Sequence, residues 1–275
     1  MSNLQKNSCD CHFHVFGPTT KYPYSKCRSY TPEDKSLKEF FSHLEKNKIS
    51  RAVIIQPSVY DLDNTASLDA LKEKPKELRA VVVIDSEHDI EELKLWNDLG
   101  VRGVRVNLLF NSSIKNSSMK KLVALIKPLN WHLQLLINVS DYSNLYEDFK
   151  DIGVDIVFDH MGHFDIKKGL YQKGFQDMLR LLKEDLVWVK LSGAYRITDE
   201  NDVPYSDVEP FAKEIIKANP DKIVWASDWP HPSISLLPPK YEELVKLLDN
   251  YTNDENIKDK IMVKNPAKLY GFDII

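Results

Sequence analysis

Residues 36–56, "SLKEFFSHLEKNKISRAVIIQ", carry the pattern that decides the fold. In the first part, 36–48, apolar side chains recur at spacings of three and four, at Leu37, Phe40, Phe41 and Leu44. This periodicity is typical of a helix that buries one face. The second part, 51–56, is a short apolar and β-branched run, which is typical of a buried strand. The stretch therefore predicts an amphipathic helix that leads into a strand.

The same alternation of segments continues along the chain. The strand-like runs cover residues 11–16, 51–56, 79–84, 100–107, 132–138, 154–160, 187–192 and 222–227. The helix-like segments include 36–48, 90–99, 118–127 and 207–219. Strands that alternate with helices pair in parallel through crossover connections. Eight such units in about 260 residues predict an α/β fold, a (β/α)8 TIM barrel, which forms one domain over residues 1–275.

Composition excludes several classes of function. The chain has 275 residues and a net charge of -4, with no basic stripe that would favour nucleic acid. No apolar stretch approaches the roughly 20 residues needed to cross a bilayer, and the start lacks the apolar run of a signal peptide. The 3 cysteines give no disulfide framework. We therefore expect a cytoplasmic protein with no nucleic-acid or membrane partner, and a homo-oligomer is left open.

Polar residues gather where the predicted strands end, which is the catalytic face of a (β/α)8 barrel. They are Asp10, His12, His14, Ser58, Arg105, Asn107, Asn138, Asp159, His160, His163, Ser192, Arg196, Ser227, Asp228 and His231. Five of the 8 histidines belong to this set. The set predicts a site that acts on a small molecule.

The run "CDCHFHVFGP", residues 9–18, places Asp10, His12 and His14 at every second position. Because a strand alternates its faces, we expect these three side chains to point together toward the barrel axis. Cys9 and Cys11 would then point away. Such a trio is costly to bury unless it is paired or ligated, so it indicates a metal or substrate site. A purely structural hydrogen-bonded trio is the alternative.

Three charged residues at other strand ends are further candidates. Asp228, in "WASDWPHP" (225–232), is positioned as a general base for water, although an aspartate before a turn also commonly caps the next segment. Arg105 and Arg196 would recognise an anionic substrate, since a guanidinium fork matches a carboxylate. Their alternative is an internal salt bridge. Residues 17–35, which include Tyr22, Tyr24 and Tyr30, are either a lid or an ordinary surface crossover.

Four motifs together resemble the amidohydrolase superfamily: "DCHFHVFGP" (10–18), "VFDHMGHFD" (157–165), "KLSGAYR" (190–196) and "ASDWPHP" (226–232). Their order and spacing are similar to the branch that contains 2-pyrone-4,6-dicarboxylate lactonases and sugar-lactone hydrolases. The resemblance covers nearly the whole chain, and it implies a (β/α)8 barrel.

The resemblance also implies roles for individual residues. Asp228 would activate water, and His12, His14 and His160 would polarise the lactone carbonyl. The substrate contacts would be Tyr30, Ser58, Arg105 and Arg196. It further implies catalysis without a metal cofactor. One zinc ion held by His12, His14 and Asp228 is the alternative, and a two-metal site is rejected because the strand of residues 100–107 ends in Arg105 and Asn107.

The sequence departs from the family pattern in its substrate contacts. A second arginine expected shortly after Arg105 is absent, with Asn111 near its place, and an expected tyrosine falls near Ile137 or Asn138. A smaller or more hydroxylated lactone acid is therefore expected, with Asn107, Asn111 and Asn138 available for its hydroxyls.

Three hypotheses follow for the function. The first is a hydrolase that opens a small carboxylated lactone by attack of Asp228-activated water. The second is a mononuclear zinc-dependent decarboxylase or hydrolase of an aromatic or muconate-type acid. The third is a barrel that binds an acid or lactone without turnover.

Overall fold

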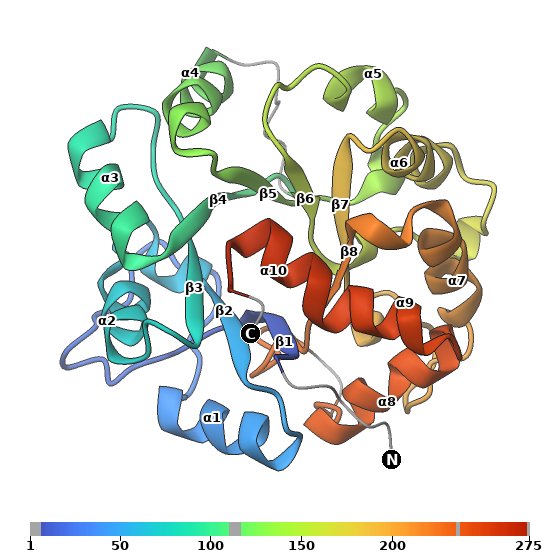
Figure 1. Cartoon of the computed structure of the whole chain (residues 1–275), viewed down its shortest axis with the longest axis horizontal. Helices are drawn as coiled ribbons and strands as arrows, with labels where there is room; N and C mark the ends of the chain where they lie inside the picture. The colour runs from blue at the N-terminus through green and yellow to red at the C-terminus, as the bar shows by residue number, and fades with distance from the viewer. Residues whose placement is uncertain (1–6, 110–116, 235–236, 274–275) are drawn as a thin grey trace.

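The computed structural model describes residues 7–109, 117–234 and 237–273. Eight parallel strands pair in chain order, and Figure 1 shows them inside a ring of helices. They are β1 Cys9–Phe13, β2 Arg51–Ile55, β3 Leu78–Val82, β4 Val101–Asn107, β5 His132–Leu136, β6 Ile156–Phe158, β7 Val187–Leu191 and β8 Ile223–Trp225. The chain beyond β8 meets β1 through a parallel bridge between Phe13 and Trp229. The predicted (β/α)8 barrel is therefore confirmed.

Helices cover the outside of the barrel. They are α1 Leu37–Lys46, α2 Thr65–Glu73, α3 Ile90–Leu99, α4 Ser117–Ile126, α5 Leu145–Phe149, α6 Lys173–Lys183, α7 Glu209–Ala218 and α8 Tyr241–Tyr251. Helix α1 begins where the Ser36 side chain accepts from the Glu39 N–H in a reciprocal capping box, which satisfies donors at the helix start. No helix in the described part of the chain is long and apolar enough to span a membrane.

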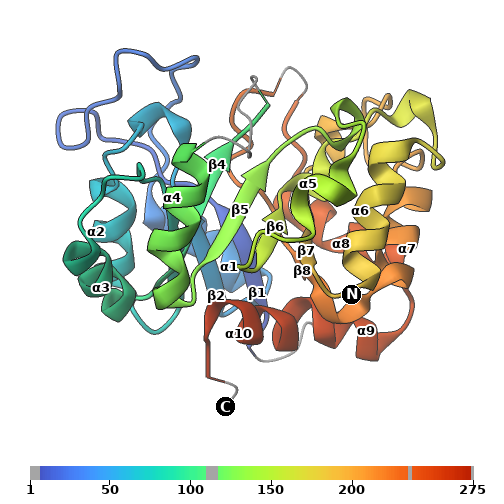
Figure 2. The ribbon, with the colours of Figure 1, turned by 90° about the horizontal axis from the view of Figure 1, so that it is seen from above.

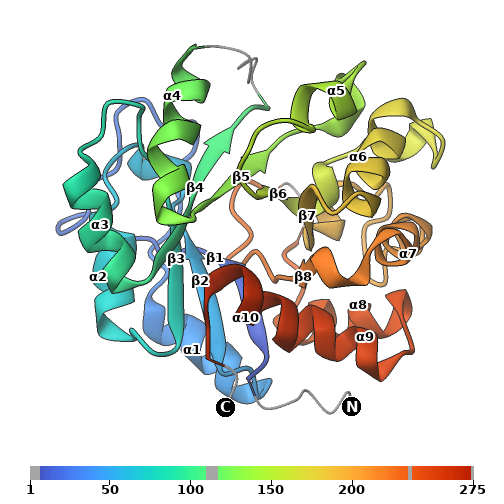
Figure 3. The same ribbon diagram turned by 45° about the horizontal axis from the view of Figure 1, so that its top comes forward.

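The last helices close the barrel at the amino-terminal ends of the strands. They are α9 Glu255–Asp259, a π-helical turn Lys260–Lys264 and α10 Asn265–Tyr270. Figures 2 and 3 show α9 and α10 packed across this end, opposite the long loops. The side chains of Ala267, Tyr270 and Phe272 complete the core inside the barrel. The amino-terminal end of the barrel is therefore covered, whereas the long loops lie at the other end.

The core has two layers. Inside the barrel lie small and medium side chains from alternate strand positions, together with one tryptophan: Cys9, Cys11, Val53, Ile55, Val81, Val157, Trp188, Val224 and Ala226. A larger layer lies between the strands and the helices. It includes the stacked rings of Phe13 and Phe40, whose centroids are 3.8 Å apart.

Strand β1 does not alternate as predicted. Its pairing with β2 shifts register between Asp10 and Phe13, which is a bulge. Cys11 packs inside the barrel and His12 also faces inward, while Asp10 points outward. The Asp10 carboxylate accepts hydrogen bonds from the Ser227 and Tyr241 hydroxyls. The prediction that Asp10 shares a face with His12 and His14, and that the cysteines point away, is therefore wrong.

Candidate active site

Four buried side chains meet at the carboxyl-terminal mouth of the barrel. His12 and His14 come from the end of β1, His160 from the 3₁₀ turn His160–Gly162 after β6, and Asp228 from the loop after β8. The Nε2 atoms of His12 and His14 are 3.2 Å apart. They lie 3.5 and 3.6 Å from Asp228 Oδ1, and His160 Nε2 lies 3.8 Å from Oδ2. The structure therefore brings together all four predicted catalytic residues.

Hydrogen bonds on the far side of each ring fix its direction. His14 Nδ1 lies 2.7 Å from the Ile55 carbonyl oxygen. Since a carbonyl only accepts, this nitrogen carries the proton and Nε2 presents a lone pair. His160 Nδ1 lies 2.9 Å from the Ser192 hydroxyl. Both rings thus turn Nε2 toward Asp228.

Asp228 is held as a carboxylate. Its Oδ2 accepts from the Tyr195 hydroxyl at 2.6 Å and from Arg196 Nε at 2.7 Å. Burial alone would raise the pKa of Asp228, but Arg196 and the surrounding histidines outweigh burial and hold that pKa well below its usual range. Its Oδ1 accepts no hydrogen bond from the described residues. This oxygen is therefore available to a water molecule or to an incoming group.

Both predicted substrate-binding arginines form internal ion pairs, as the alternative interpretation of their sequence positions expects. Arg196 pairs with Asp228, and Arg105 Nε donates to Asp159 Oδ2 at 3.0 Å. Burial would raise the pKa of Asp159, yet Lys190, His12 and Arg105 hold it well below the ordinary value. Two arginines and two carboxylates therefore form fixed pairs at the rim of the site.

Tyr30 and Ser58 form a hydrogen bond with each other, and the Tyr30 phenol lies within electrostatic range of both arginines. Burial raises the pKa of the Tyr30 phenol, and a hydrogen bond with Ser58 partly offsets this. Arg105, Asp228 and Arg196 also act on it electrostatically, which places the phenol at the mouth.

The other two tyrosines of residues 17–35 anchor the segment elsewhere. The Tyr22 hydroxyl donates to Asp69 Oδ2 at 3.0 Å, and the Tyr24 ring packs on Tyr60 with centroids 5.2 Å apart. Only Tyr30 of the three thus lies at the mouth.

The asparagines predicted to bind hydroxyls are engaged locally where the structure describes them. Asn107 Oδ1 accepts from the Leu109 N–H at 3.1 Å. Asn138 Oδ1 accepts from the Ser140 N–H at 2.9 Å and caps a 3₁₀ turn. Asn111 lies outside the described residues.

Several functional neighbours escaped sequence reasoning. Tyr195 bonds Asp228, Gln134 bonds Asp159, and Lys190 lies against His12. Lys190 did leave a signal, because it interrupts the apolar run "VWVKLS" and a lysine is rarely buried without a partner. Gln134 and Tyr195 left none, since their partners come from distant strands.

The backbone of the site is left-handed at residues other than glycine. The φ angles are +49° at His160, +47° at His163, +61° at Asp228 and +63° at His231. Side chains with a Cβ rarely adopt this region, and such residues cluster at functional sites. The loops after β6 and β8 therefore aim their side chains at a cost in backbone energy.

The cluster offers a donor set for one metal ion. His12, His160 and Asp228 each present a ligand atom, and these atoms lie within 4.8 Å of one another. His12, His14 and Asp228, the set predicted for zinc, are separated by 3.2, 3.5 and 3.6 Å. Ligands of a tetrahedral zinc at bond lengths of about 2.1 Å are about 3.4 Å apart. These residues therefore fit a single zinc ion.

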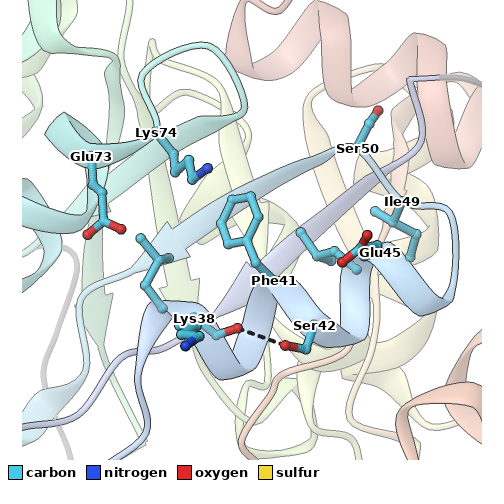
Figure 4. Close-up of a pocket in the computed structure, with 10 residues that line it drawn as sticks. Lys38, Phe41, Ser42, Glu45, Ile49, Ser50, Glu73 and Lys74 are labelled. Carbon is cyan, nitrogen blue, oxygen red and sulfur yellow. Dashed lines mark hydrogen bonds between the residues drawn. The ribbon is translucent and has the colours of Figure 1, made fainter.

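A separate hollow lies on the outside of the barrel. Figure 4 shows it between α1 and the end of α2, with Phe41 facing Lys74. The Lys74 ammonium lies 5.3 Å from the Phe41 ring centroid. None of the strand-end candidates lines this hollow, so it is not the predicted site.

A closed barrel with a buried cluster of three histidines and an ionised aspartate at its mouth defines a barrel hydrolase of the amidohydrolase type. Residues 9–272 match the family model described as "Amidohydrolase". The chain belongs to the amidohydrolase family, as the motifs predicted.

Individual proteins are similar to this chain over nearly its full length. The chain is 32% identical to 4-sulfomuconolactone hydrolase of Hydrogenophaga intermedia, over 98% of this chain and 90% of that one. It is 31% identical to 2-pyrone-4,6-dicarboxylate hydrolase of Comamonas testosteroni, over 97% of this chain and 91% of that one. A crystal structure of a probable 2-pyrone-4,6-dicarboxylic acid hydrolase from Acinetobacter baumannii, with citric acid bound, superposes with a TM-score of 0.85. That match has 29% identity and covers 97% of this chain and 100% of that chain.

Proposed function

We propose that this protein hydrolyses the ring ester of a small anionic lactone. The observation that carries the proposal is the ionised Asp228, whose Oδ1 is free of hydrogen bonds from the described residues and faces the histidine Nε2 atoms. The lactone hydrolases among the relatives support the same chemistry.

The reaction begins when Asp228 accepts a proton from water. The water oxygen attacks the ring carbonyl carbon, and the carbon–oxygen bond of the ring then breaks. Asp228 returns its proton to the departing ring oxygen, which becomes a hydroxyl, and the new carboxylic acid ionises to a carboxylate by losing its proton to solvent. The neutral N–H groups of His12 and His160 stabilise the oxyanion, a contribution of about 2.7–4 kcal/mol for a measured donor. His14 presents a lone pair and fixes His12 rather than donating.

Two cations and two hydroxyl groups hold the acidic part of the substrate. Arg105 uses Nε for Asp159, and its two terminal amino groups have no hydrogen bond to the described residues, so they can bind an anion. Arg196, Tyr30 and Ser58 border the same mouth. Since Arg196 also binds Asp228, a substrate carboxylate that draws on Arg196 makes Asp228 a stronger base. The substrate class is therefore a lactone with at least one carboxylate or comparable anion.

Catalysis proceeds without a metal in this proposal. Arg196 contacts Asp228 and Lys190 contacts His12, and cations in these positions oppose a dication held by the same two residues. If zinc is resident, His12, His14 and Asp228 hold it, with His160 adjacent, and it supplies Lewis-acid activation of water. Metal analysis of protein purified without chelators distinguishes the two cases.

The proposal is tested with Asp228→Asn on a panel of pyrone, muconate-derived and sugar-acid lactones. Loss of a general base lowers kcat by about 10²- to 10⁴-fold. The exposed Asp61→Asn is the matched control and keeps wild-type activity. If wild type opens no lactone of the panel, or if Asp228→Asn opens one at the wild-type rate, the proposal is wrong.

A zinc-dependent decarboxylase or hydrolase of an aromatic or muconate-type acid is the second candidate. The His12, His160 and Asp228 group favours it. Near-stoichiometric zinc, together with activity that a chelator removes and zinc restores, would establish this candidate instead of the first.

A further inference from the structure

Lys190 is a fully buried lysine that projects from β7 toward the axis of the barrel. Its neighbours along the strand are apolar, and its side chain is 0% exposed. Lysines are almost never fully buried unless they are paired. The contacts of its ammonium group therefore indicate what it does.

Three groups surround Lys190 Nζ. Gln134 Oε1 accepts from it at 2.7 Å, and His12 Nδ1 lies at 3.3 Å in hydrogen-bond geometry. Asp159 Oδ1 is also 3.3 Å away. Gln134 Nε2 in turn donates to Asp159 Oδ2 at 3.1 Å, which fixes the amide orientation. Lys190 is thus held from two sides and directed at His12.

The hydrogen bonds above Lys190 have a defined direction. His14 donates through Nδ1 to Ile55, so its Nε2 must accept, and the His12 Nε2 at 3.2 Å must be the donor. A neutral His12 with its proton on Nε2 has a lone pair on Nδ1, and Lys190 donates to that lone pair. Asp159 Oδ1 lies 3.4 Å from the same Nδ1 and is the acceptor that the other tautomer of His12 would use.

We propose that Lys190 is a positioning residue that holds His12 in the tautomer with its proton on Nε2, aimed at the mouth of the barrel. The effect of this tautomer on catalysis rests on the proposed lactone hydrolysis. When the lactone carbonyl enters, the His12 N–H turns from His14 Nε2 to the carbonyl oxygen. Without Lys190, His12 can place its proton on Nδ1 and donate to Asp159, which leaves the carbonyl without that donor.

The test compares wild type with Lys190→Met, which keeps the length of the side chain and removes its donor. Long-range ¹H–¹⁵N NMR of the protein as purified, with zinc measured on the same sample, reads the tautomer of His12. We expect a proton on Nε2 in wild type and on Nδ1 in Lys190→Met. We also expect kcat to fall by about 10- to 100-fold, a range usual for residues that orient a functional histidine, while KM changes little.

The exposed Lys183→Met is the matched control and alters neither readout. A wild-type His12 with its proton on Nδ1 overturns the inference even if Lys190→Met does not fold. A fall in kcat without a change of tautomer, or no change in either, also overturns it. The tautomer is measured without substrate. The role of Lys190 can therefore be tested even if the protein hydrolyses none of the lactones.

Discussion

At the scale of single residues, the three buried carboxylates Asp10, Asp159 and Asp228 have pKa values shifted in opposite directions, although burial by itself raises all three. Asp159 and Asp228 are stabilised as anions because lysine, arginine and histidine side chains surround them. Asp10 has only neutral donors, and burial raises its pKa to about 6 against partial compensation from Ser227, Tyr241 and the His12 backbone. Of these three buried carboxylates, Asp10 is therefore the one whose ionisation opposes folding.

This difference predicts a pH dependence of stability. Because the folded-state pKa of Asp10 lies above its ordinary value of 3.8, the folded protein binds that proton more tightly than the unfolded chain. The Asp10 contribution is thus full below about pH 4 and is lost as the pH rises through about 6, a change of about 3 kcal/mol.

Urea unfolding of wild type and Asp10→Asn at several pH values checks this prediction. The asparagine keeps an Oδ1 that accepts from the backbone N–H groups of His12 and Ser227, and its amide nitrogen donates to the hydroxyls of Ser227 and Tyr241. The wild-type free energy of unfolding should fall relative to the variant between pH 4 and 6. A difference that is constant over this range would contradict the raised pKa.

At the scale of elements, the barrel could be predicted from sequence and the bulge in β1 could not. The pattern in residues 36–56 indicates a helix buried on one face and a strand buried on both faces. Such burial patterns are local properties of the sequence. The bulge depends on how β1 pairs with β2, and the sequence of β1 alone does not specify that pairing. The ion pairs of Arg105 and Arg196 were hidden for the same reason, because their partners lie 54 and 32 positions along the chain.

The strand-end histidines and Asp228 could be predicted because strand ends meet at one mouth in a barrel. Lys190 and Gln134 could not be assigned to the site, since they lie deeper in β7 and β5. Lys190 reaches His12 only across the barrel, and Gln134 binds Lys190 and Asp159.

The bulge predicts how the cysteines react. Cys9 and Cys11 lie inside the barrel with their sulfurs 3.7 Å apart, while Cys27 is exposed. A thiol reagent such as DTNB should therefore modify one cysteine rapidly in the native protein and all three in denaturant. Cys27→Ser should abolish the rapid phase. Rapid native modification of the Cys27→Ser variant would contradict the inward placement of Cys9 and Cys11.

At the scale of the whole molecule, the candidate site and the helix that covers the barrel lie at opposite ends. The loops at the carboxyl ends of the strands carry the site, and α10 closes the amino-terminal end. Tyr270 of α10 is fully buried, and its hydroxyl has no hydrogen-bond partner among the described residues. Its ring, rather than its hydroxyl, therefore stabilises this end.

Two substitutions separate ring from hydroxyl. Tyr270→Ala should lower the free energy of unfolding by about 3–5 kcal/mol, as for other buried aromatic residues. Tyr270→Phe should be neutral or stabilising, because it removes a buried polar group that lacks a partner. Denaturant titration measures both, and kcat of the folded Tyr270→Phe variant should equal that of wild type. A large loss of stability in Tyr270→Phe would show that the hydroxyl has a partner.

The left-handed backbone at His160, His163, Asp228 and His231 sets a limit on how this protein can be improved. Glycine relieves such a conformation, which costs other residues about 1 kcal/mol or more each. Relief of this strain would favour glycine, but at Asp228 it would also leave the buried Arg196 guanidinium without its carboxylate partner. At His160 and Asp228 the lost side chain belongs to the proposed catalytic cluster, so any thermal tolerance gained there would be exchanged for turnover.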